Sequence, residues 1–530
     1  MRFFSLAALL IILMMSAGCS SQSTDESTEQ ASPIRFSNTY KAPEFTEKDR
    51  IQKIREALRE SHSYYAESAE ANHLPGVVYG LVVDDSLVFQ GGYGTTNIET
   101  GEPLTGQSLF RIASMTKSFT AMAILKLRDE GKLSLLDPVS GYIPQLRSLS
   151  YISSDATLVN IWNLLTMTAG FPEDNPWGDR FLDMSDEALM KQVEEGISFS
   201  TVTSLHYEYS NLGFGLLGHI ISTVSDLSYQ EYITQNILLP LGMTHTYWEF
   251  SEVPQNLLAL GYRWGNEHWI AEPLLHDGAF GAMGGLITSI EDFSKYISFH
   301  LSAWPPRSDP PDGGPVKRSS LREMHRMNNP RYYSDPMRFN EESGPIMRGY
   351  GYGLVAMKDH QGIVEVGHNG GLPGFGSSYM FYPEYGIGIM AFSNLTYVGE
   401  TVRSANYRVM KQLISQNLFV PRELPVSDIL ARRSVQVAEL VQSWDPALEE
   451  EIVATNLYMD ISREKRMEEA KRLFSQAGEI ISVGAVIPEN QMRGSFVLKG
   501  SSKSMKVSFT LTPEAEPRVQ WITLELISSE

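Results

Sequence analysis

Strand-like patterns occupy both ends of the first 400 residues in this chain of 530. The segment 76–83 is almost wholly apolar and is followed by the turn Asp84-Asp85-Ser86, which predicts a hairpin with the segment 87–92. Three later segments show the strand pattern again, with tight turns between them: 363–367, 377–382 and 386–394. The first strands of this unit therefore come from its N-terminal part and the last from its C-terminal part.

Apolar residues recur at helical spacing between these two groups of strands. One helical pattern begins near Glu47, and the longest extends from about Ser114 to Gly131. Shorter helices follow, interrupted by Pro138, Pro144 and the turn 170–172. This order predicts an α+β fold with an antiparallel sheet flanked by helices, in which the intervening helices form a second, all-helical lobe.

Two other segments are less regular. The Pro-rich stretch 304–315 and the polar residues up to Arg348 predict an excursion over the surface. Residues 421–445 predict a linker. An amphipathic helix and three or four short strands follow it, so we expect a small C-terminal α+β module at residues 446–530.

The first residues have the parts of a signal peptide. Arg2 is basic, residues 3–15 are apolar except for Ser5, and Ser16-Ala17-Gly18-Cys19 follows. The apolar run is too short to span a membrane but suits a secretory signal. Small residues before a lone cysteine resemble the bacterial lipoprotein processing site, although Ser16 stands where leucine is usual.

We therefore expect residues 1–18 to be removed as a lipoprotein signal peptide and Cys19 to carry the lipid. Residues 20–33 are polar and contain no aromatic residue, and we expect residues 19–46 to form a flexible tether. The protein would then be held on a membrane of the bacterial cell envelope, facing the periplasm or the exterior. An ordinary secretory peptide, cut nearby, is the alternative.

Composition narrows the choice of partner. Hydrophobic residues make up 42% of the chain and charged residues 20%, which is the balance of a folded protein with a sizeable core. Acidic residues outnumber basic ones by 63 to 43, and a net charge of −20 repels phosphate backbones, so we expect no nucleic-acid partner. Cys19 is the single cysteine, which excludes internal disulfides and a cysteine-based zinc site.

Ser114 and Lys117 form the first group of residues that suggests chemistry. They lie three positions apart at the start of the long helical pattern and so share one face. A serine hydroxyl needs a base, and lysine can serve only if its pKa falls by roughly 3 units, which burial and a helix N-terminus can supply. The spacing alone is weak evidence, because Ser462 and Lys465 repeat it at what we expect to be a solvated helix start.

The second group is Tyr209-Ser210-Asn211, which precedes the apolar helical run 212–221. A phenol near a lysine can relay a proton, and an asparagine amide can hold a substrate carbonyl. Taken alone, this group is better interpreted as a tyrosine of the core followed by the N-cap of a helix.

The third group is His368-Asn369-Gly370-Gly371, at the end of a strand pattern. Glycine lets a ligand lie close against strand backbone, where free N–H groups can bind an oxyanion. A lone histidine beside a turn is more often structural.

In this order and at these intervals, the three groups resemble the serine β-lactamase and penicillin-recognising hydrolase family, in its class C-like, esterase and D-aminopeptidase branch. Several flanking segments are similar to that family as well: Phe110-Arg111-Ile112-Ala113, Leu164-Leu165-Thr166, Leu239-Pro240-Leu241-Gly242-Met243 and Gly284-Gly285-Leu286-Ile287-Thr288-Ser289. The resemblance covers about residues 50–415. It implies a β-lactamase/transpeptidase-like fold for a domain at residues 47–420.

The resemblance also implies catalytic roles. Ser114 would be the acylated nucleophile, Lys117 its activating base and Tyr209 the acid/base towards the leaving group. Asn211 would contact a substrate amide. No metal or organic cofactor is implied.

The third motif would complete the substrate site. The backbone N–H groups of Ser114 and Gly371 would form the oxyanion hole, with Gly370 and His368 beside it. His368 stands where β-lactamases commonly carry lysine, and a histidine is mostly neutral at pH 7–8. It would then be able to hydrogen-bond Tyr209 or a substrate oxygen, but would attract a β-lactam carboxylate weakly.

The leading hypothesis is therefore a lipid-anchored serine hydrolase that forms an acyl-enzyme with small esters or with amides such as D-amino-acid peptides. A true class C β-lactamase is the first alternative. A catalytically silent binding module of the cell envelope is the second.

Overall fold

The computed structural model describes residues 37, 39–309, 313–333 and 344–528. The expected signal peptide at residues 1–18 and the lipidation site Cys19 lie outside these residues. Within the described part of the chain, no helix is both long and apolar enough to cross a bilayer.

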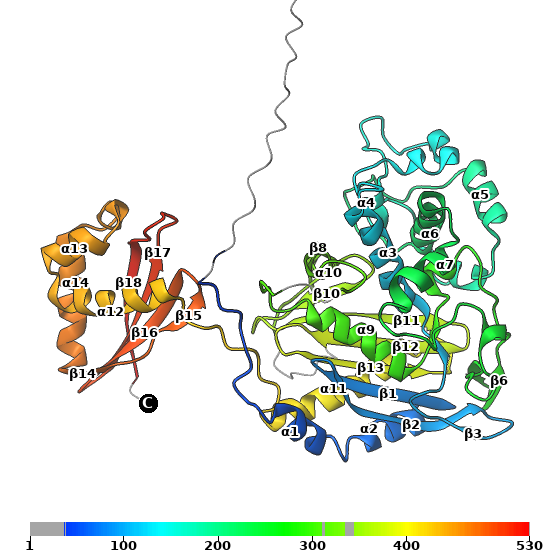
Figure 1. Ribbon diagram of the computed structural model, residues 1–530, viewed down its shortest axis with the longest axis horizontal. Helices are drawn as coiled ribbons and strands as arrows, with labels where there is room; N and C mark the ends of the chain where they lie inside the picture. Colours follow the sequence, from blue (N-terminus) through cyan, green and yellow to red (C-terminus); the bar gives the residue numbers. More distant parts are fainter. Residues whose placement is uncertain (1–36, 38, 310–312, 334–343, 529–530) are drawn as a thin grey trace, which may run out of the picture. The chain divides into compact units, whose positions relative to one another are not determined.

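A nine-stranded antiparallel sheet forms the centre of the first large unit (Figure 1). Its strand order is β3-β2-β1-β13-β12-β11-β10-β9-β8. The bounds of these strands are β1 (Gly76–Val83), β2 (Ser86–Asn97), β3 (Glu102–Pro103), β8 (Asn328–Tyr333), β9 (Ile346–Tyr350), β10 (Val355–Lys358), β11 (Val364–Leu372), β12 (Phe375–Tyr382) and β13 (Ile387–Ser393). Because β1 pairs with β13, early and late strands meet in mid-sheet, as the order of the sequence patterns predicts.

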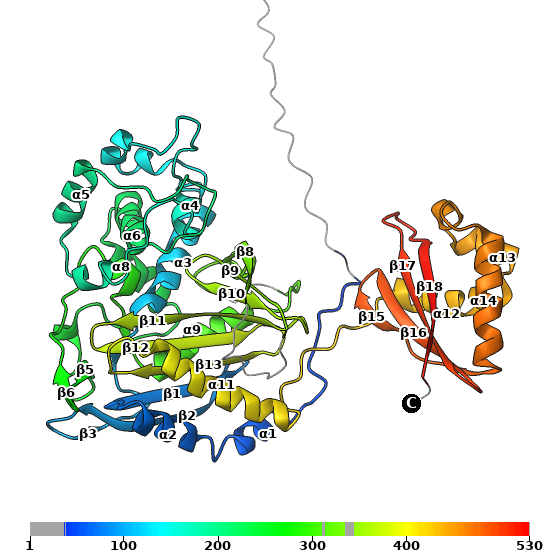
Figure 2. The ribbon, with the colours of Figure 1, turned by 180° about the vertical axis from the view of Figure 1, so that it is seen from behind.

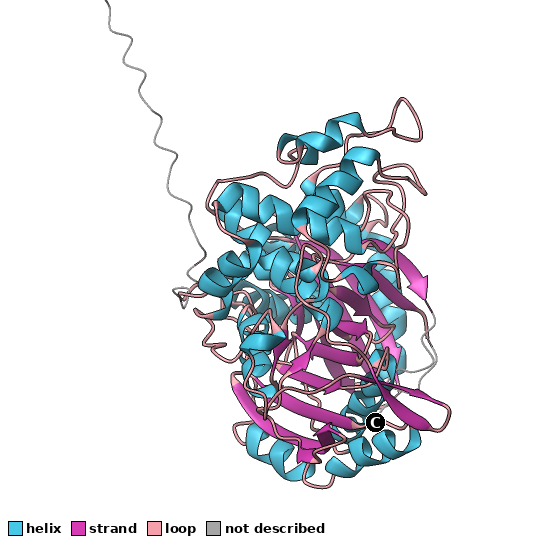
Figure 3. Cartoon of the chain, turned by 90° about the vertical axis from the view of Figure 1, so that its right-hand side faces the viewer, coloured by secondary structure: helices cyan, strands magenta, loops and turns pink. Residues whose placement is uncertain are grey.

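Helices cover both faces of this sheet, as Figures 2 and 3 show. One face carries α1 (Arg50–Ala57), α2 (His62–Ala71) and α11 (Gly399–Ser415), and the other carries α9 (Ile290–Ser302). Alternate side chains of β1 enter the two cores: Val77 and Leu81 pack on the side of Tyr65, and Val78 and Val82 on the side of Phe293. A strand buried on both faces has no polar alternation, which explains the unbroken apolar run.

The all-helical lobe lies between the two groups of strands in sequence, as expected (Figure 1). Its helices are α3 (Lys117–Asp129), α4 (Ile161–Leu165), α5 (Asp186–Glu195), α6 (Asn211–Ser225), α7 (Tyr229–Ile233) and α8 (Gly281–Gly284). Two short antiparallel strand pairs lie outside the nine-stranded sheet. In one, β4 (Phe110–Arg111) pairs with β7 (Ile287–Thr288), and in the other, β5 (Tyr262–Gly265) pairs with β6 (His268–Ala271). Glycine at position 218 allows close packing in this lobe, because a Cβ there would lie 2.6 Å from the Ala282 side chain.

The prediction of a surface excursion up to Arg348 was wrong in part. The segment contains a helix, α10 (Arg318–Met324), the edge strand β8 of the sheet and its neighbour β9. The sequence hides β9 because the neighbouring residues Met347 and Arg348 are both exposed, so the strand shows no apolar/polar alternation.

The C-terminal module is a five-stranded antiparallel sheet packed against helices. Its elements are α12 (Asp428–Ser443), α13 (Pro446–Ile452), α14 (Arg463–Ala477), β14 (Ile480–Val483), β15 (Ile487–Asn490), β16 (Arg493–Gly500), β17 (Ser504–Leu511) and β18 (Val519–Ile527). Leu430 and Val437 of α12 belong to the same core as Phe496 and Phe509. The segment 421–445 is therefore not a plain linker, because an amphipathic helix within it completes the core of the module.

Candidate active site

Ser114 lies where the chain turns sharply from β4 into the helical lobe. Ala113 has φ +52°, a left-handed conformation that is rare for residues other than glycine, asparagine or aspartate. The turn leads into a 3₁₀ segment, Ala113–Thr116, that continues directly as α3. Strain of this kind is found at functional sites, where the surrounding structure holds it in place.

Lys117 is completely buried beneath Ser114. Its Nζ lies 3.0 Å from Ser114 Oγ, 2.7 Å from Asn211 Oδ1 and 3.1 Å from the Met283 carbonyl oxygen. Burial lowers the pKa of Lys117 to about 7, against the opposing effect of the Asp179 and Asp174 carboxylates. A substantial fraction of this lysine is therefore neutral at physiological pH, as a base must be.

Tyr209 completes a triangle around the serine. Its hydroxyl donates a hydrogen bond of 2.9 Å to Ser114 Oγ, and Lys117 Nζ lies 4.9 Å from the centre of its ring. Burial raises the pKa of Tyr209 well above its usual value. The phenol is thus protonated in the resting state and is placed to donate rather than to accept a proton.

Asn211 occupies a different position from the one expected of a substrate contact. Its side chain is fully buried, accepts a hydrogen bond from Lys117 and donates one of 2.7 Å to Asn175 Oδ1. It does not line the cavity at Ser114, whereas Asn175 does. The expectation is corrected accordingly: Asn211 contacts the lysine beneath the cavity, and Asn175 is the asparagine of this pair that lines it.

The N-terminus of α6 is held by two polar side chains. Ser210 caps the helix by accepting from the Gly213 N–H, and the two Asp174 oxygens accept from the Asn211 and Leu212 N–H groups at 2.7 Å each. These bonds satisfy backbone donors that have no intrahelical partner and suit the positive end of the helix. They fix Tyr209 and Asn211 at the cavity end of α6.

The third motif lies within β11 and not after its end. The pairing of β11 with β10 stops at Gly367, while its pairing with β12 continues to Leu372. The segment from His368 to Gly371 therefore has one open edge, which packs against the Ser114 turn. A Cβ at Gly370 would lie 2.4 Å from the Ile112 carbonyl oxygen, so only glycine allows this approach.

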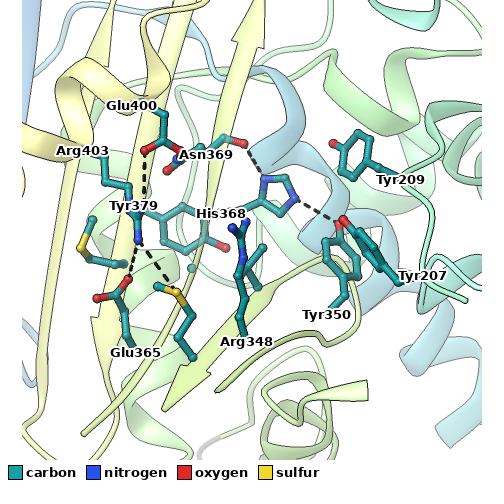
Figure 4. Close-up of a pocket in the computed structure, with 14 residues that line it drawn as sticks. Tyr207, Tyr209, Arg348, Tyr350, Glu365, His368, Asn369, Tyr379, Glu400 and Arg403 are labelled. Atoms are coloured by element: carbon teal, nitrogen blue, oxygen red, sulfur yellow. Dashed lines mark hydrogen bonds and ion pairs between the residues drawn. The ribbon is translucent and has the colours of Figure 1, made fainter. Parts of the chain in front are cut away.

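His368 is bound on both ring nitrogens (Figure 4). Nδ1 donates to the Asn369 carbonyl oxygen, and Nε2 accepts from the Tyr350 hydroxyl at 3.1 Å. The expected partner Tyr209 is instead a ring neighbour, with 6.2 Å between ring centres. Burial, with a smaller effect of Lys117, lowers the pKa of His368 to about 3, so the ring stays neutral throughout the physiological range.

A cavity of about 530 Å³ opens beside the serine. Its described lining includes Ser114, Asn175, Pro176, Asp179, Tyr209, His368, Asn369, Gly370, Gly371, Tyr397, Gly399 and Glu400. A smaller cavity of about 150 Å³ shares His368 and Tyr209 with it and also contains Arg348 (Figure 4). The structure thus brings together all the predicted residues around Ser114, with Lys117 and Asn211 beneath the floor.

Several residues of the site were not predicted. Asp174, Asn175 and Asp179 lie in one segment, and their concentration of polar and turn residues is a signal that sequence reasoning could have used. Tyr350 and Tyr397 are single tyrosines in unrelated segments, and nothing in the local sequence distinguishes them.

Comparison with known proteins assigns the larger part of the chain to a protein family. The family model described as Beta-lactamase matches residues 54–414. The chain belongs to the Beta-lactamase family. The α+β fold and the family expected from the motifs are thereby confirmed, and the C-terminal module lies outside the matched region of this Beta-lactamase family protein.

Relatives are found in bacteria and beyond. "Protein flp" of Staphylococcus aureus (strain NCTC 8325 / PS 47) is 30% identical over 358 residues, which cover 64% of this chain and 64% of that protein. "Beta-lactamase-like protein 2" of Dictyostelium discoideum is 28% identical over 260 residues, covering 48% of this chain and 47% of that one. This chain therefore matches less than two thirds of the length of either relative.

A solved structure supports the fold of the Beta-lactamase family protein. The octameric penicillin-binding protein homologue from Pyrococcus abyssi superimposes with a TM-score of 0.54 at 22% sequence identity. The match covers 89% of this chain and 96% of that one. At this identity the likeness concerns the fold alone.

Proposed function

We propose that this member of the Beta-lactamase family is a serine hydrolase that forms an acyl-enzyme on Ser114. The observation that carries the proposal is the triangle of Ser114, Lys117 and Tyr209, in which Lys117 Nζ lies 3.0 Å and the Tyr209 hydroxyl 2.9 Å from Ser114 Oγ. A serine is activated when a base within hydrogen-bond reach takes its proton.

In the acylation step, neutral Lys117 takes the proton of Ser114 Oγ while that oxygen attacks the carbonyl carbon. The developing negative charge lies on the former carbonyl oxygen, against the Ser114 and Gly371 N–H groups at the open edge of β11. Tyr209 donates its proton to the leaving alcohol or amine and is reprotonated from Lys117. Water then attacks the acyl-enzyme with the proton transfers reversed, and Ser114 is released.

The alternative of a silent binding module is less well supported. A buried, partly neutral lysine beside a strained serine turn gains nothing for stability, and groups with such shifted pKa values concentrate at functional sites. Treating the protein with a fluorophosphonate and measuring its intact mass tests the choice. We expect one adduct per chain on Ser114, whereas an unlabelled protein would support the binding module.

The site favours uncharged acyl groups over β-lactams. A β-lactam carries a carboxylate, but His368 stays neutral and the described lining of the Ser114 cavity contains Asp179 and Glu400 without lysine or arginine. A like charge a few ångströms from a carboxylate costs about 1 kcal/mol or more, which changes a rate by roughly tenfold. We expect kcat/KM for a short-chain p-nitrophenyl ester to exceed that for nitrocefin and benzylpenicillin by at least this factor at pH 7.5.

Arg348 provides the control for this prediction. It lines the smaller cavity together with His368, so its guanidinium is a cation that could attract a carboxylate there. If Arg348→Ala lowers β-lactam turnover and leaves ester turnover unchanged, this arginine replaces the missing lysine. Faster turnover of β-lactams than of esters by the wild-type protein would favour the β-lactamase alternative.

We also propose that the enzyme acts at the cell envelope, held by a lipid on Cys19. Several acyl chains on one cysteine exceed the marginal membrane affinity of a single chain. Fractionation of cells should place the wild-type protein with membranes, and Cys19→Ser should leave it unprocessed or soluble. A soluble wild-type protein whose N-terminus lies beyond Cys19 would contradict this proposal.

A further inference from the structure

The segment of β11 beside Ser114 is supported by the sheet on one side only. Its pairing with β10 ends at Gly367, and the residues from His368 to Gly371 pair with β12 alone among the described strands. An oxyanion hole is effective when its N–H groups are held in place before the charge develops. Contacts from outside the sheet can supply this rigidity, and the side chain of Asn369 makes one of them.

Asn369 uses both halves of its amide. Its Oδ1 accepts a hydrogen bond of 2.7 Å from Ser378 Oγ, and its Nδ2 donates one of 2.6 Å to Glu400 Oε1. Ser378 lies opposite Asn369 on β12, and Glu400 lies in the first turn of α11. The backbone carbonyl oxygen of Asn369 also accepts from His368 Nδ1. An amide can accept and donate at the same time, so this side chain joins β11 to a helix as well as to the neighbouring strand.

The start of α11 lies directly against this part of β11. A Cβ at Gly399, the first residue of the helix, would lie 2.7 Å from the Gly370 carbonyl oxygen, so the close contact needs glycine. Glu400 follows in the first turn, where a carboxylate suits the positive end of a helix. The position of the Gly370 backbone is thus tied to the position of α11.

A second contact, further along the two elements, fixes α11 to β11. Arg403 lies 3.3 Å from Glu400 and 3.4 Å from Glu365 of β11 (Figure 4), and the Tyr407 hydroxyl donates 2.9 Å to Glu365 Oε1. Glu365 and Asn369 are four residues apart on one face of the strand, which is about 13 Å. Positions 400, 403 and 407 share one face of the helix and span about 10 Å, so the same helix face serves both ends. Solvent weakens surface ion pairs, but Glu365 and Arg403 are both buried.

We propose that Asn369 is a positioning residue for the oxyanion hole. Held between Ser378 and Glu400, its side chain fixes the Gly370–Gly371 backbone at the distance that the developing oxyanion requires. Asn369 acts through this backbone and not on the reacting atoms themselves. The inference rests on the proposed acyl transfer at Ser114.

The test compares an oxygen ester with its sulfur analogue. N–H groups that are placed for an oxyanion stabilise charge on oxygen better than charge on sulfur, which is larger and accepts hydrogen bonds more weakly. The ratio of kcat/KM for p-nitrophenyl acetate to kcat/KM for p-nitrophenyl thionoacetate therefore reports how well the hole is aligned. Both esters share the same base and the same leaving group, so a change in the pKa of Lys117 cancels in this ratio.

Asn369→Asp keeps the shape of the side chain and an acceptor for Ser378, but it replaces the donor to Glu400 with a like charge. We expect kcat/KM for the oxygen ester to fall by at least about thirtyfold and the ester ratio by at least about fivefold. Asn72→Asp is the matched control, because it also removes an amide donor, here from a bond of 2.8 Å to the Ser68 carbonyl oxygen at the exposed end of α2. It should leave the ester ratio unchanged.

Glu400→Gln, added to Asn369→Asp, should rescue the site. The hydrogen bond then returns with donor and acceptor exchanged, because the new amide nitrogen donates to the new carboxylate while the amide oxygen still accepts from Arg403. We expect the double variant to regain at least about fivefold in kcat/KM over Asn369→Asp and to recover most of the ester ratio. A variant that merely folds less well loses both esters alike. An unchanged ratio in Asn369→Asp, without rescue in the double variant, would overturn the positioning role.

Ser378→Ala is the second variant should Asn369→Asp fail to fold. It removes the other hydrogen bond of the amide and should lower the ester ratio by at least about threefold, and an unchanged ratio would again count against the positioning role. In either case acyl transfer at Ser114 stands if the wild-type protein hydrolyses the oxygen ester. No turnover of either ester by the wild-type protein, together with no fluorophosphonate adduct on Ser114, would overturn the proposed function and this inference with it.

Discussion

Replacing Ser114 with alanine should lower kcat/KM for every acyl substrate by at least about 10⁴-fold, because the residues that act with the serine form one functional unit. Lys117 and Tyr209 remain in place in this variant, but no oxygen is left to form the acyl-enzyme. Steady-state hydrolysis of the preferred ester, measured with enough enzyme to detect a residual rate, checks this expectation.

A second serine in the chain offers a matched control. Ser462 and Lys465 repeat the spacing of Ser114 and Lys117 at the start of α14, where Ser462 caps the helix by accepting from the Lys465 N–H. Ser462→Ala should keep full activity and cost only about 1 kcal/mol of unfolding free energy through the lost cap. Even a tenth of wild-type turnover in Ser114→Ala would refute the assignment of the nucleophile.

The comparison of these two serines also shows what sequence alone could predict. The spacing is identical, and only the order of the three motifs along the chain distinguished Ser114 from Ser462. What separates them chemically is burial: Lys117 is completely buried, whereas Lys465 is exposed on a helix surface. Burial of one side chain by residues about 100 and 170 positions away, Asn211 and Met283, cannot be derived from a local pattern.

Long-range contacts likewise explain the residues that were missed or misassigned. Asn211 was expected to face the substrate, but its side-chain amide donates a hydrogen bond to Asn175 Oδ1 instead. This contact depends on how the 174–179 loop folds over α6. His368 was expected to titrate near neutrality, and its pKa falls because the folded chain buries the ring, with a smaller effect of the Lys117 charge. Tyr350 comes from β9, a strand whose exposed residues Met347 and Arg348 give no strand pattern in the sequence.

More of the fold could be predicted from the sequence, because strands and helices leave periodic patterns of apolar residues. Buried strands such as β1 and β13 are continuous apolar runs, and the order of strands and helices limits the topologies that a chain can adopt. The boundary of the C-terminal module was harder to predict, because an amphipathic helix such as α12 has the same sequence pattern whether it belongs to a linker or completes a core.

The second large effect that we expect concerns Lys117 and pH. Only the neutral amine can take the serine proton, and burial lowers the pKa of Lys117 to about 7. Raising the pH through this value increases the neutral fraction, so kcat/KM for an uncharged ester should rise from pH 5.5 to 8. Below the pKa it should fall about tenfold for each pH unit.

Lys117→Ala should lower kcat/KM by at least about 10³-fold and should abolish its rise with pH, while Lys465→Ala should change neither. The carboxylate of Asp179 raises the pKa of Lys117, because a nearby anion stabilises the protonated amine. Asp179→Asn should therefore move the rise of kcat/KM to lower pH for a short-chain p-nitrophenyl ester, which has no titratable group in its acyl part. If kcat/KM rises at the same pH in Asp179→Asn as in the wild-type protein, or if the wild-type kcat/KM falls between pH 6 and 8, a group other than Lys117 is the base.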